Sequence, residues 1–213
     1  MGAVLRPQTS TRDQLLAAGR KIVLTGGFQD LTVRAVATSA DANLGSFVYH
    51  FGTRDAFVRT MIEEWYAPLL VRVRDVAAGT GRPLDRLRQT ILQLVDFGGR
   101  HDVFISRILL AAAAGEPAAR RFLASLAGRH PKVLVRLIRD AQQDGALVDE
   151  NPLQVACFLM ASVGLPRIIA AAWQGPPLFG KTLSATLGRI ARDPDRVLQR
   201  LDWAIQGLTP RGR

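Results

Sequence analysis

The chain has 213 residues, of which 48% are hydrophobic and 22% are charged, so it can bury a sizeable core, and the disordered and fibrous classes are excluded. Its formal net charge of +10 favours a polyanionic partner, either nucleic acid or an anionic membrane surface. Arginine supplies most of the basic residues, a bias that a GC-rich genome also produces, so the charge alone gives modest support.

The single cysteine and the N-terminal segment indicate the compartment. Cys157 has no second cysteine with which to form a disulfide, which fits a reducing environment. Its apolar neighbours predict that it packs as a small hydrophobic residue, with a redox sensor as the alternative. Residues 1–10 lack the apolar core of a signal peptide, and the longest apolar stretch, 155–173, is interrupted by polar residues and a proline. We therefore expect a cytoplasmic protein without a membrane partner.

Helical periodicity recurs along the chain, and strand patterns are nearly absent. A first helix is predicted over residues 11–25, with two glycines after it. A second helix follows Thr32, a good N-cap, over residues 33–40. Asn43 is placed to cap a third helix over residues 44–51. Gly52 ends that helix, and Thr53 caps a fourth that runs to about residue 76.

The rest of the chain is also predicted to be helical. A glycine- and proline-containing linker lies at residues 79–83, and a similar loop lies at 174–182. The helices are expected at roughly 84–98, 102–114, 117–128, 131–144, 152–173 and 194–208. The sequence thus predicts an all-α fold of about nine helices. Residues 1–52 would form an N-terminal three-helix domain, and residues 53–213 a C-terminal helical domain.

The second and third predicted helices are joined by a three-residue turn, the spacing of a helix-turn-helix whose second helix enters the DNA major groove. Phe47 and Phe51 lie four residues apart and are expected to anchor the third helix inward. Ser46, Tyr49 and His50 then point away from that anchor. They are predicted to contact DNA; the alternative for Tyr49 and His50 is an amphipathic rim around a core.

Gly45 is a second indication of a DNA contact. Glycine inside a helix costs about 1 kcal/mol relative to alanine. Close approach of the backbone to another surface, here a phosphate, is a reason to tolerate that cost. No carboxylate occurs between Leu44 and Phe51, which also suits a polyanionic partner.

The segment from Phe28 to Phe57 resembles the DNA-binding domain of the TetR family of repressors, in register over roughly residues 11–60. The combination that carries the resemblance is the small residue at 45, the aromatic-His-Phe ending at 51 and Thr53-Arg54-Asp55. The resemblance implies a three-helix DNA-binding domain, a long fourth helix as lever, and a variable C-terminal domain for ligand binding and dimerisation.

The resemblance also implies which residues contact DNA. By position these are Thr32, Asn43, Leu44, Gly45, Ser46, Val48, Tyr49, His50 and Arg54. Thr32 and Arg54 would hold phosphates, and Ser46 and Val48 would face base edges. The sequence departs from the family at Leu44, where a basic or polar residue is common, and at Val48, where tyrosine is common. Both departures reduce hydrogen-bonding readout, although Val48 can touch a thymine methyl.

The predicted helix over residues 152–173 is apolar nearly all round, so it must be covered on both sides. One side can meet the chain's own core and the other a second copy of the chain. Together with the last helix, this predicts a four-helix homodimer interface, as the family resemblance implies. The side chains expected in it are Leu159, Val163, Leu201 and Ile205. The alternative is a larger monomeric core.

The resemblance further implies a ligand pocket between the fourth and seventh helices. Its candidate wall consists of Trp65, Phe97, Phe104, Ile108 and Leu137. Its candidate polar contacts are Asp96, His101 and Arg107. Each of these residues can instead be ordinary core or surface.

Residue patterns for catalysis are absent: the sequence has no glycine-rich phosphate loop, no nucleophile elbow and no close His/Cys metal spacing. We therefore expect no catalytic residues, no metal, no cofactor and no enzymatic activity. The predicted function is a homodimeric repressor that binds a roughly palindromic double-stranded operator and is released by a small, largely apolar effector. The alternatives are an enzyme whose histidines cluster in space and an adaptor that uses its helix-turn-helix on a protein.

Overall fold

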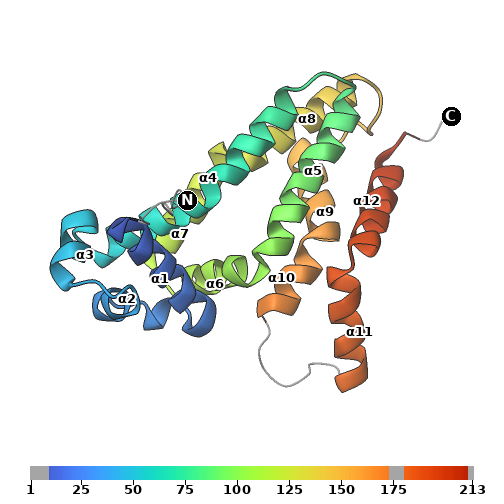
Figure 1. Cartoon of the computed structure of the whole chain (residues 1–213). Helices are drawn as coiled ribbons and strands as arrows, with labels where there is room; N and C mark the ends of the chain where they lie inside the picture. The colour runs from blue at the N-terminus through green and yellow to red at the C-terminus, as the bar shows by residue number, and fades with distance from the viewer. Residues whose placement is uncertain (1–9, 173–179, 211–213) are drawn as a thin grey trace, which may run out of the picture. The chain divides into compact units, whose positions relative to one another are not determined.

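The computed structural model describes residues 10–172 and 180–210, and every regular element in these ranges is helical (Figure 1). The predicted all-α class is confirmed, with more helices than the nine expected. The helices are α1 Thr11–Gly26, α2 Val33–Ser39, α3 Leu44–Phe51, α4 Arg54–Ala78, α5 Pro83–Arg100, α6 Asp102–Ala113, α7 Pro117–Ser125, α8 His130–Gln143, α9 Pro152–Val163, α10 Leu165–Ala172, α11 Lys181–Arg192 and α12 Pro194–Leu208, with 3-10 turns η1 Phe28–Asp30 and η2 Leu126–Gly128.

The helix expected over residues 152–173 is instead two helices, α9 and α10, which meet at Gly164 with a bend of 51°. Pro166 has no N–H to donate to the carbonyl of Ser162, so the helical hydrogen-bond ladder breaks there. That carbonyl accepts a hydrogen bond from Arg200 Nε at 3.0 Å. The expected end at Trp173 lies outside the described residues. No single described helix is long and apolar enough to cross a membrane, although the bent α9–α10 pair passes that test by length and composition.

Helix α11 is a further departure from the sequence prediction, which gave no helix between residues 182 and 193. The expected loop at 174–182 lies outside the described residues up to 179, and α11 begins at Lys181. Leu183, Leu187 and Ile190 recur at helical spacing along it, and all three are exposed.

The chain packs as two compact units. Of the described residues, one unit comprises those up to Trp65 together with Arg107–Phe122, and the other comprises Tyr66–Ser106 and those from Leu123 onward. The first unit therefore contains α1–α3, the first half of α4 and the corner between α6 and α7. The expected boundary between residues 52 and 53 falls between α3 and α4, and as a functional boundary it stays a prediction.

Three phenylalanines hold α3 against α4 in the first unit. The ring of Phe57 lies 5.1 Å from that of Phe47 and 4.9 Å from that of Phe51, centroid to centroid. All three are buried. Helix α1 packs on α2 and α3, and a Cβ at Gly19 of α1 would lie 2.5 Å from the Phe57 ring. Glycine at this position lets α1 approach α4 closely.

In the second unit, α8 packs on α5 and on α9, and α9 packs on α12 (Figure 1). Each of these helices turns a stripe of apolar residues inward, including Ile91, Leu137, Leu159 and Leu201. Burial of these stripes is the main stabilisation of this unit.

Candidate nucleic-acid interface

Local side-chain bonds define the start of α2 and of α3. The Thr32 hydroxyl oxygen accepts a hydrogen bond from the Ala35 N–H at 3.1 Å, and Asn43 Oδ1 accepts one from the Ser46 N–H at 2.7 Å. Both are N-caps, as the sequence predicts. Between the helices, Asp41 adopts a φ of 50°, which aspartate tolerates better than most residues. The helix-turn-helix expected over residues 33–51 is present.

A glycine and a second threonine cap separate α3 from α4. Gly52 has a φ of 69°, and its N–H donates to the Val48 carbonyl at 2.8 Å. The Thr53 hydroxyl oxygen then accepts from the Ala56 N–H at 3.1 Å. The chain therefore turns sharply after α3, so that α4 begins immediately beside it.

The side of α3 that faces away from the buried phenylalanines carries large exposed side chains. Tyr49 is 85% exposed and Val48 is 56% exposed, and Leu44 is exposed as well. Ser46 and His50 are half-exposed, and the rings of Tyr49 and His50 lie 5.0 Å apart. A tyrosine with most of its surface in solvent covers little core, which argues against the amphipathic rim. This face is open for a partner.

Gly45 lies on the same face, and the protein itself gives little reason for a glycine there. In the part of the chain that the structure describes, a Cβ at this position would have one neighbour within 4 Å beyond the adjacent backbone, the Asn43 cap oxygen at 3.2 Å. The residue is exposed. The space over the α3 backbone is therefore open, which fits close approach by another molecule.

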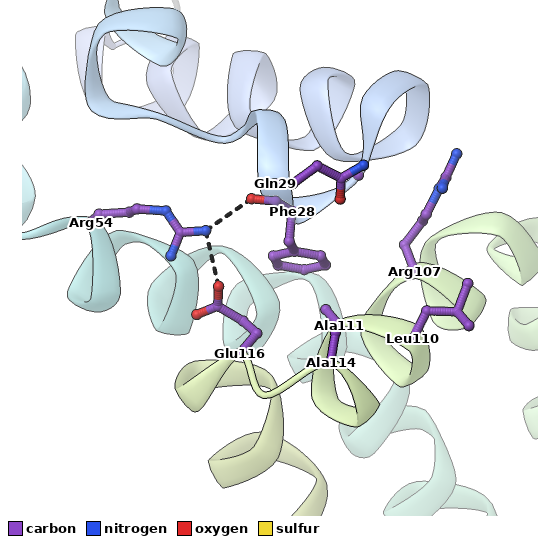
Figure 2. A pocket seen from close by; sticks show the side chains of 9 residues that line it. Phe28, Gln29, Arg54, Arg107, Leu110, Ala111, Ala114 and Glu116 are labelled. Atoms are coloured by element: carbon purple, nitrogen blue, oxygen red, sulfur yellow. Dashed lines mark hydrogen bonds and ion pairs between the residues drawn. The ribbon is translucent and has the colours of Figure 1, made fainter.

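Arg54 has partners inside the protein. Its Nε donates to the Leu31 carbonyl at 2.7 Å, and its Nη2 donates to the Phe28 carbonyl at 2.9 Å. The same Nη2 lies 2.9 Å from a carboxylate oxygen of Glu116, as Figure 2 shows. Sequence reasoning missed Glu116, which lies far from Arg54 along the chain. A phosphate contact by Arg54 stays a prediction, but the structure gives this side chain a different set of partners.

A groove of about 550 Å³ lies beside this ion pair in the first unit (Figure 2). Its lining comes from η1 and from the α6–α7 corner and includes Phe28, Gln29, Leu110, Ala111 and Ala114.

The residues expected to line a ligand pocket do not line this groove, apart from Arg107 among the polar candidates. Phe97, Phe104, Ile108 and Leu137 are buried, and Trp65 is half-buried. Asp96 bonds Arg100, and the His101 ring lies 4.5 Å from that of Phe97. The pocket that these residues would form stays a prediction.

The choice of dimer-interface side chains needs correction. Leu159, Val163 and Leu201 are at most 1% exposed within a single chain, so they have no surface left for a partner; Ile205 is half-exposed. The sequence shows that the helix is apolar nearly all round, but it does not show which of these side chains the chain itself covers. The exposed apolar side chains on these helices are Leu153, Phe158, Leu165, Ile169, Leu198 and Trp203. Cys157 is also exposed, so it does not pack as a small hydrophobic residue within the chain itself.

The model of the family described as bacterial regulatory proteins, tetR family, matches residues 15–61. This range contains α2, α3 and the caps described above. Over these residues the chain is similar to the TetR family of bacterial regulatory proteins. The sequence-based identification is thereby confirmed, and the TetR-type segment is the one that carries the open face of α3.

Named transcriptional repressors are similar to this chain in sequence. The transcriptional repressor NemR of Escherichia coli is 31% identical over 93 residues, which are 41% of this chain and 47% of that protein. The chain therefore matches about half the length of this relative. The transcriptional repressor NicS of Pseudomonas putida is 24% identical over 155 residues, which are 72% of this chain and 73% of that protein.

Two solved structures show that the likeness of fold extends beyond the TetR-type segment. Reduced E. coli NemR has a TM-score of 0.67 at 22% identity, with 95% of this chain and 100% of that chain covered. FadR of Thermus thermophilus, solved in complex with lauroyl-CoA, has a TM-score of 0.56 at 18% identity, with 95% and 97% covered. Both helical units thus have counterparts in known regulators.

Proposed function

We propose that this chain is a sequence-specific DNA-binding transcriptional regulator, a repressor, that reads DNA with α3. The observation that carries the proposal is the outward face of α3, where exposed Val48 and Tyr49 lie one helical turn after Gly45 on a helix-turn-helix. A helix of this kind fits the major groove, and its N-terminal residues meet base edges.

The residues of this face divide into two roles. Ser46 and Val48 face base edges, with the hydroxyl as a hydrogen-bonding group and the valine against a thymine methyl. Tyr49 and His50 contact the phosphate backbone. The Thr32 oxygen is used by its cap, but its hydroxyl hydrogen is still available to a phosphate oxygen. Leu44 and Asn43 lie at the start of α3, where backbone N–H groups favour an anion.

The regulator acts as a homodimer on a roughly palindromic operator. Support comes from the exposed apolar side chains of α9 and α12, among them Phe158 and Trp203, which a second copy would cover. A two-fold dimer presents two copies of α3, and these fill two half-sites about one DNA turn, roughly 34 Å, apart.

A small, largely apolar effector releases the operator. The buried aromatic residues Phe97 and Phe104 support an apolar site, and FadR, which shares the fold, was solved with lauroyl-CoA. An effector that favours a different spacing of the two α3 helices weakens DNA binding by its differential affinity for the two states.

Capture of fragmented genomic DNA by the purified chain tests the proposal. The expected result is enrichment of a few fragments that share a palindromic sequence, with an affinity that falls steeply as salt rises. A panel of lipophilic compounds is then screened for release of the enriched fragment. Absence of any enrichment over random DNA would overturn the proposed function and favour an adaptor or an enzyme.

A further inference from the structure

The first two residues of α4 both form ion pairs with residues at the start of α7. In one pair α4 supplies the cation, and in the other it supplies the anion. Arg54 lies 2.9 Å from Glu116, the residue before α7. Its neighbour Asp55 lies 2.6 Å from Arg121, in the second turn of α7. The corner itself is fixed, because Arg120 Nε donates to the Ala112 carbonyl at 2.8 Å. A rigid corner thus faces the first turn of α4 with a carboxylate and a guanidinium.

The two ion pairs differ in strength. The Asp55 and Arg121 side chains are both more than half exposed, and pairs of this kind contribute little. The Glu116 side chain is only 12% exposed, and that of Arg54 is 35% exposed. The Arg54–Glu116 pair is therefore screened less by water, and it contributes more than the Asp55–Arg121 pair to holding α4 against the α6–α7 corner.

Arg54 also binds the backbone just before α2, the first of the two helices of the helix-turn-helix. Its two other bonds go to the carbonyls of Phe28 and Leu31, which lie in η1 and just before the Thr32 cap of α2. A guanidinium can hold two carbonyls and a carboxylate at once because its N–H groups form a rigid fork. The start of α2 is therefore tied, through one side chain, to a residue of the α6–α7 corner.

We infer that Glu116 is a positioning residue for DNA binding: it fixes the Arg54 guanidinium, and Arg54 fixes the backbone from which α2 and α3 start. This inference rests on the proposed function. It extends the set of residues on which DNA binding depends beyond residues 15–61, to Glu116 between α6 and α7. It also replaces a phosphate-contacting role for Arg54 with a supporting one.

The two roles of Arg54 predict effects of opposite sign in Glu116→Gln. If Arg54 contacts phosphate, loss of Glu116 charge frees the guanidinium and removes a negative charge, so DNA binds more tightly. If Arg54 is a positioning residue, the substitution weakens the interaction that holds its guanidinium, and operator affinity falls by about fivefold or more. The matched control is Glu64→Gln, which removes the same charge from the same unit and breaks the Arg12–Glu64 pair.

Arg54→Lys adds an independent readout. Lysine binds phosphate as a point charge, so a phosphate contact would survive this change. Lysine cannot reproduce the fork, so the positioning role predicts that Arg54→Lys binds the operator as weakly as Arg54→Ala. The slope of log affinity against log salt stays at the wild-type value in Arg54→Lys and Glu116→Gln, because no phosphate contact is lost.

Amide hydrogen exchange of α2 and α3 in the DNA-free chain separates this inference from the proposed function. Faster exchange there in Glu116→Gln and Arg54→Lys, but not in Glu64→Gln, supports positioning even if no operator is found. Unchanged exchange in both variants overturns the inference. Tighter DNA binding by Glu116→Gln than by Glu64→Gln also overturns it, while leaving the proposed function intact.

Discussion

Arg54 Nη2 lies 2.9 Å from a carboxylate oxygen of Glu116, so the first residue of α4 is paired with the residue that precedes α7. A cation in the first turn of a helix opposes the positive end of the helix dipole. Glu116 and the carbonyls of Phe28 and Leu31 compensate this cation. Arg54, which the sequence predicts as a phosphate contact, therefore has a structural role through its contacts within the protein.

Gly45→Ala is expected to separate stability from DNA binding. Among the described residues, the new Cβ would have one neighbour within 4 Å beyond the adjacent backbone, Asn43 Oδ1 at 3.2 Å, so the Asn43 side chain must shift slightly. Alanine favours the helix by about 1 kcal/mol, so the free energy of unfolding should be unchanged or rise. Operator affinity should fall because the Cβ occupies the space into which DNA approaches.

The comparison for Gly45→Ala is Gly98→Ala, where a Cβ on α5 would meet no atom of another described segment within 4 Å. Urea unfolding and fluorescence anisotropy on a selected operator give the two readouts. Equal operator affinity of wild type and Gly45→Ala would show that the backbone of α3 does not approach DNA.

Gly19→Ala is expected to destabilise the TetR-type segment. The new Cβ would lie 2.5 Å from the ring of Phe57, which is fully buried against Phe47 and Phe51 and cannot move aside freely. Overpacking of this kind costs about 1–3 kcal/mol, which outweighs the gain in helix propensity. The measurement is the free energy of unfolding, with Gly98→Ala as the control that should not lose stability. A Gly19→Ala variant as stable as wild type would mean that α1 and α4 are packed less tightly than described.

Trp203→Glu and Phe158→Glu are expected to dissociate the dimer without unfolding the chain. Both side chains are at least half exposed, so the charge stays in solvent in the monomer but would be buried in an interface. Light scattering should give twice 23.2 kDa for wild type and 23.2 kDa for the double variant. Leu159→Arg, by contrast, places a charge in the core and should unfold the chain. A double variant that remains dimeric would place the interface elsewhere.

Acid is expected to destabilise the second unit through His130. Burial and the neighbouring Arg129 guanidinium lower the pKa of His130 to about 4. Its Nδ1 lies 2.7 Å from the Tyr66 hydroxyl. The unfolded chain takes up this proton near pH 6.5 and the folded chain only near pH 4, so stability present above pH 6.5 is lost as pH falls toward 4.

The loss should reach about 2 kcal/mol between pH 7 and pH 5. Urea unfolding at the two pH values measures it. His130→Asn should lose less stability than wild type over this range, with a smaller slope left from His101, whose pKa burial also lowers. An equal loss in wild type and variant would show that His130 titrates normally in the folded chain.

Features set by neighbouring residues could be predicted from the sequence, and features set by packing could not. The caps Thr32, Asn43 and Thr53 act over three residues, and Gly52 acts on its own backbone, so each was found. Which apolar side chains of α9 face inward depends on its packing against α8 and α12, so Leu159 was assigned to the interface although the chain itself buries it, and exposed Phe158 was not.

Other differences have the same cause. The partner of Arg54 is distant in sequence, and no local pattern indicates that Glu116 forms an ion pair with an arginine. The break at Gly164 follows from Pro166, a local signal. The helix nevertheless looked continuous because its apolar pattern continues across the break.

Parallel selection of DNA sequences by wild type and by Ser46→Ala is the most direct test that α3 reads DNA. Wild type should enrich a palindrome from a random library, and Ser46→Ala should enrich the same palindrome with preference relaxed at one symmetric position per half-site, by about 1–3 kcal/mol. Positions elsewhere in the site should keep their preference. No enrichment by wild type, or identical preferences for the two proteins at every position, would contradict the assignment of this face.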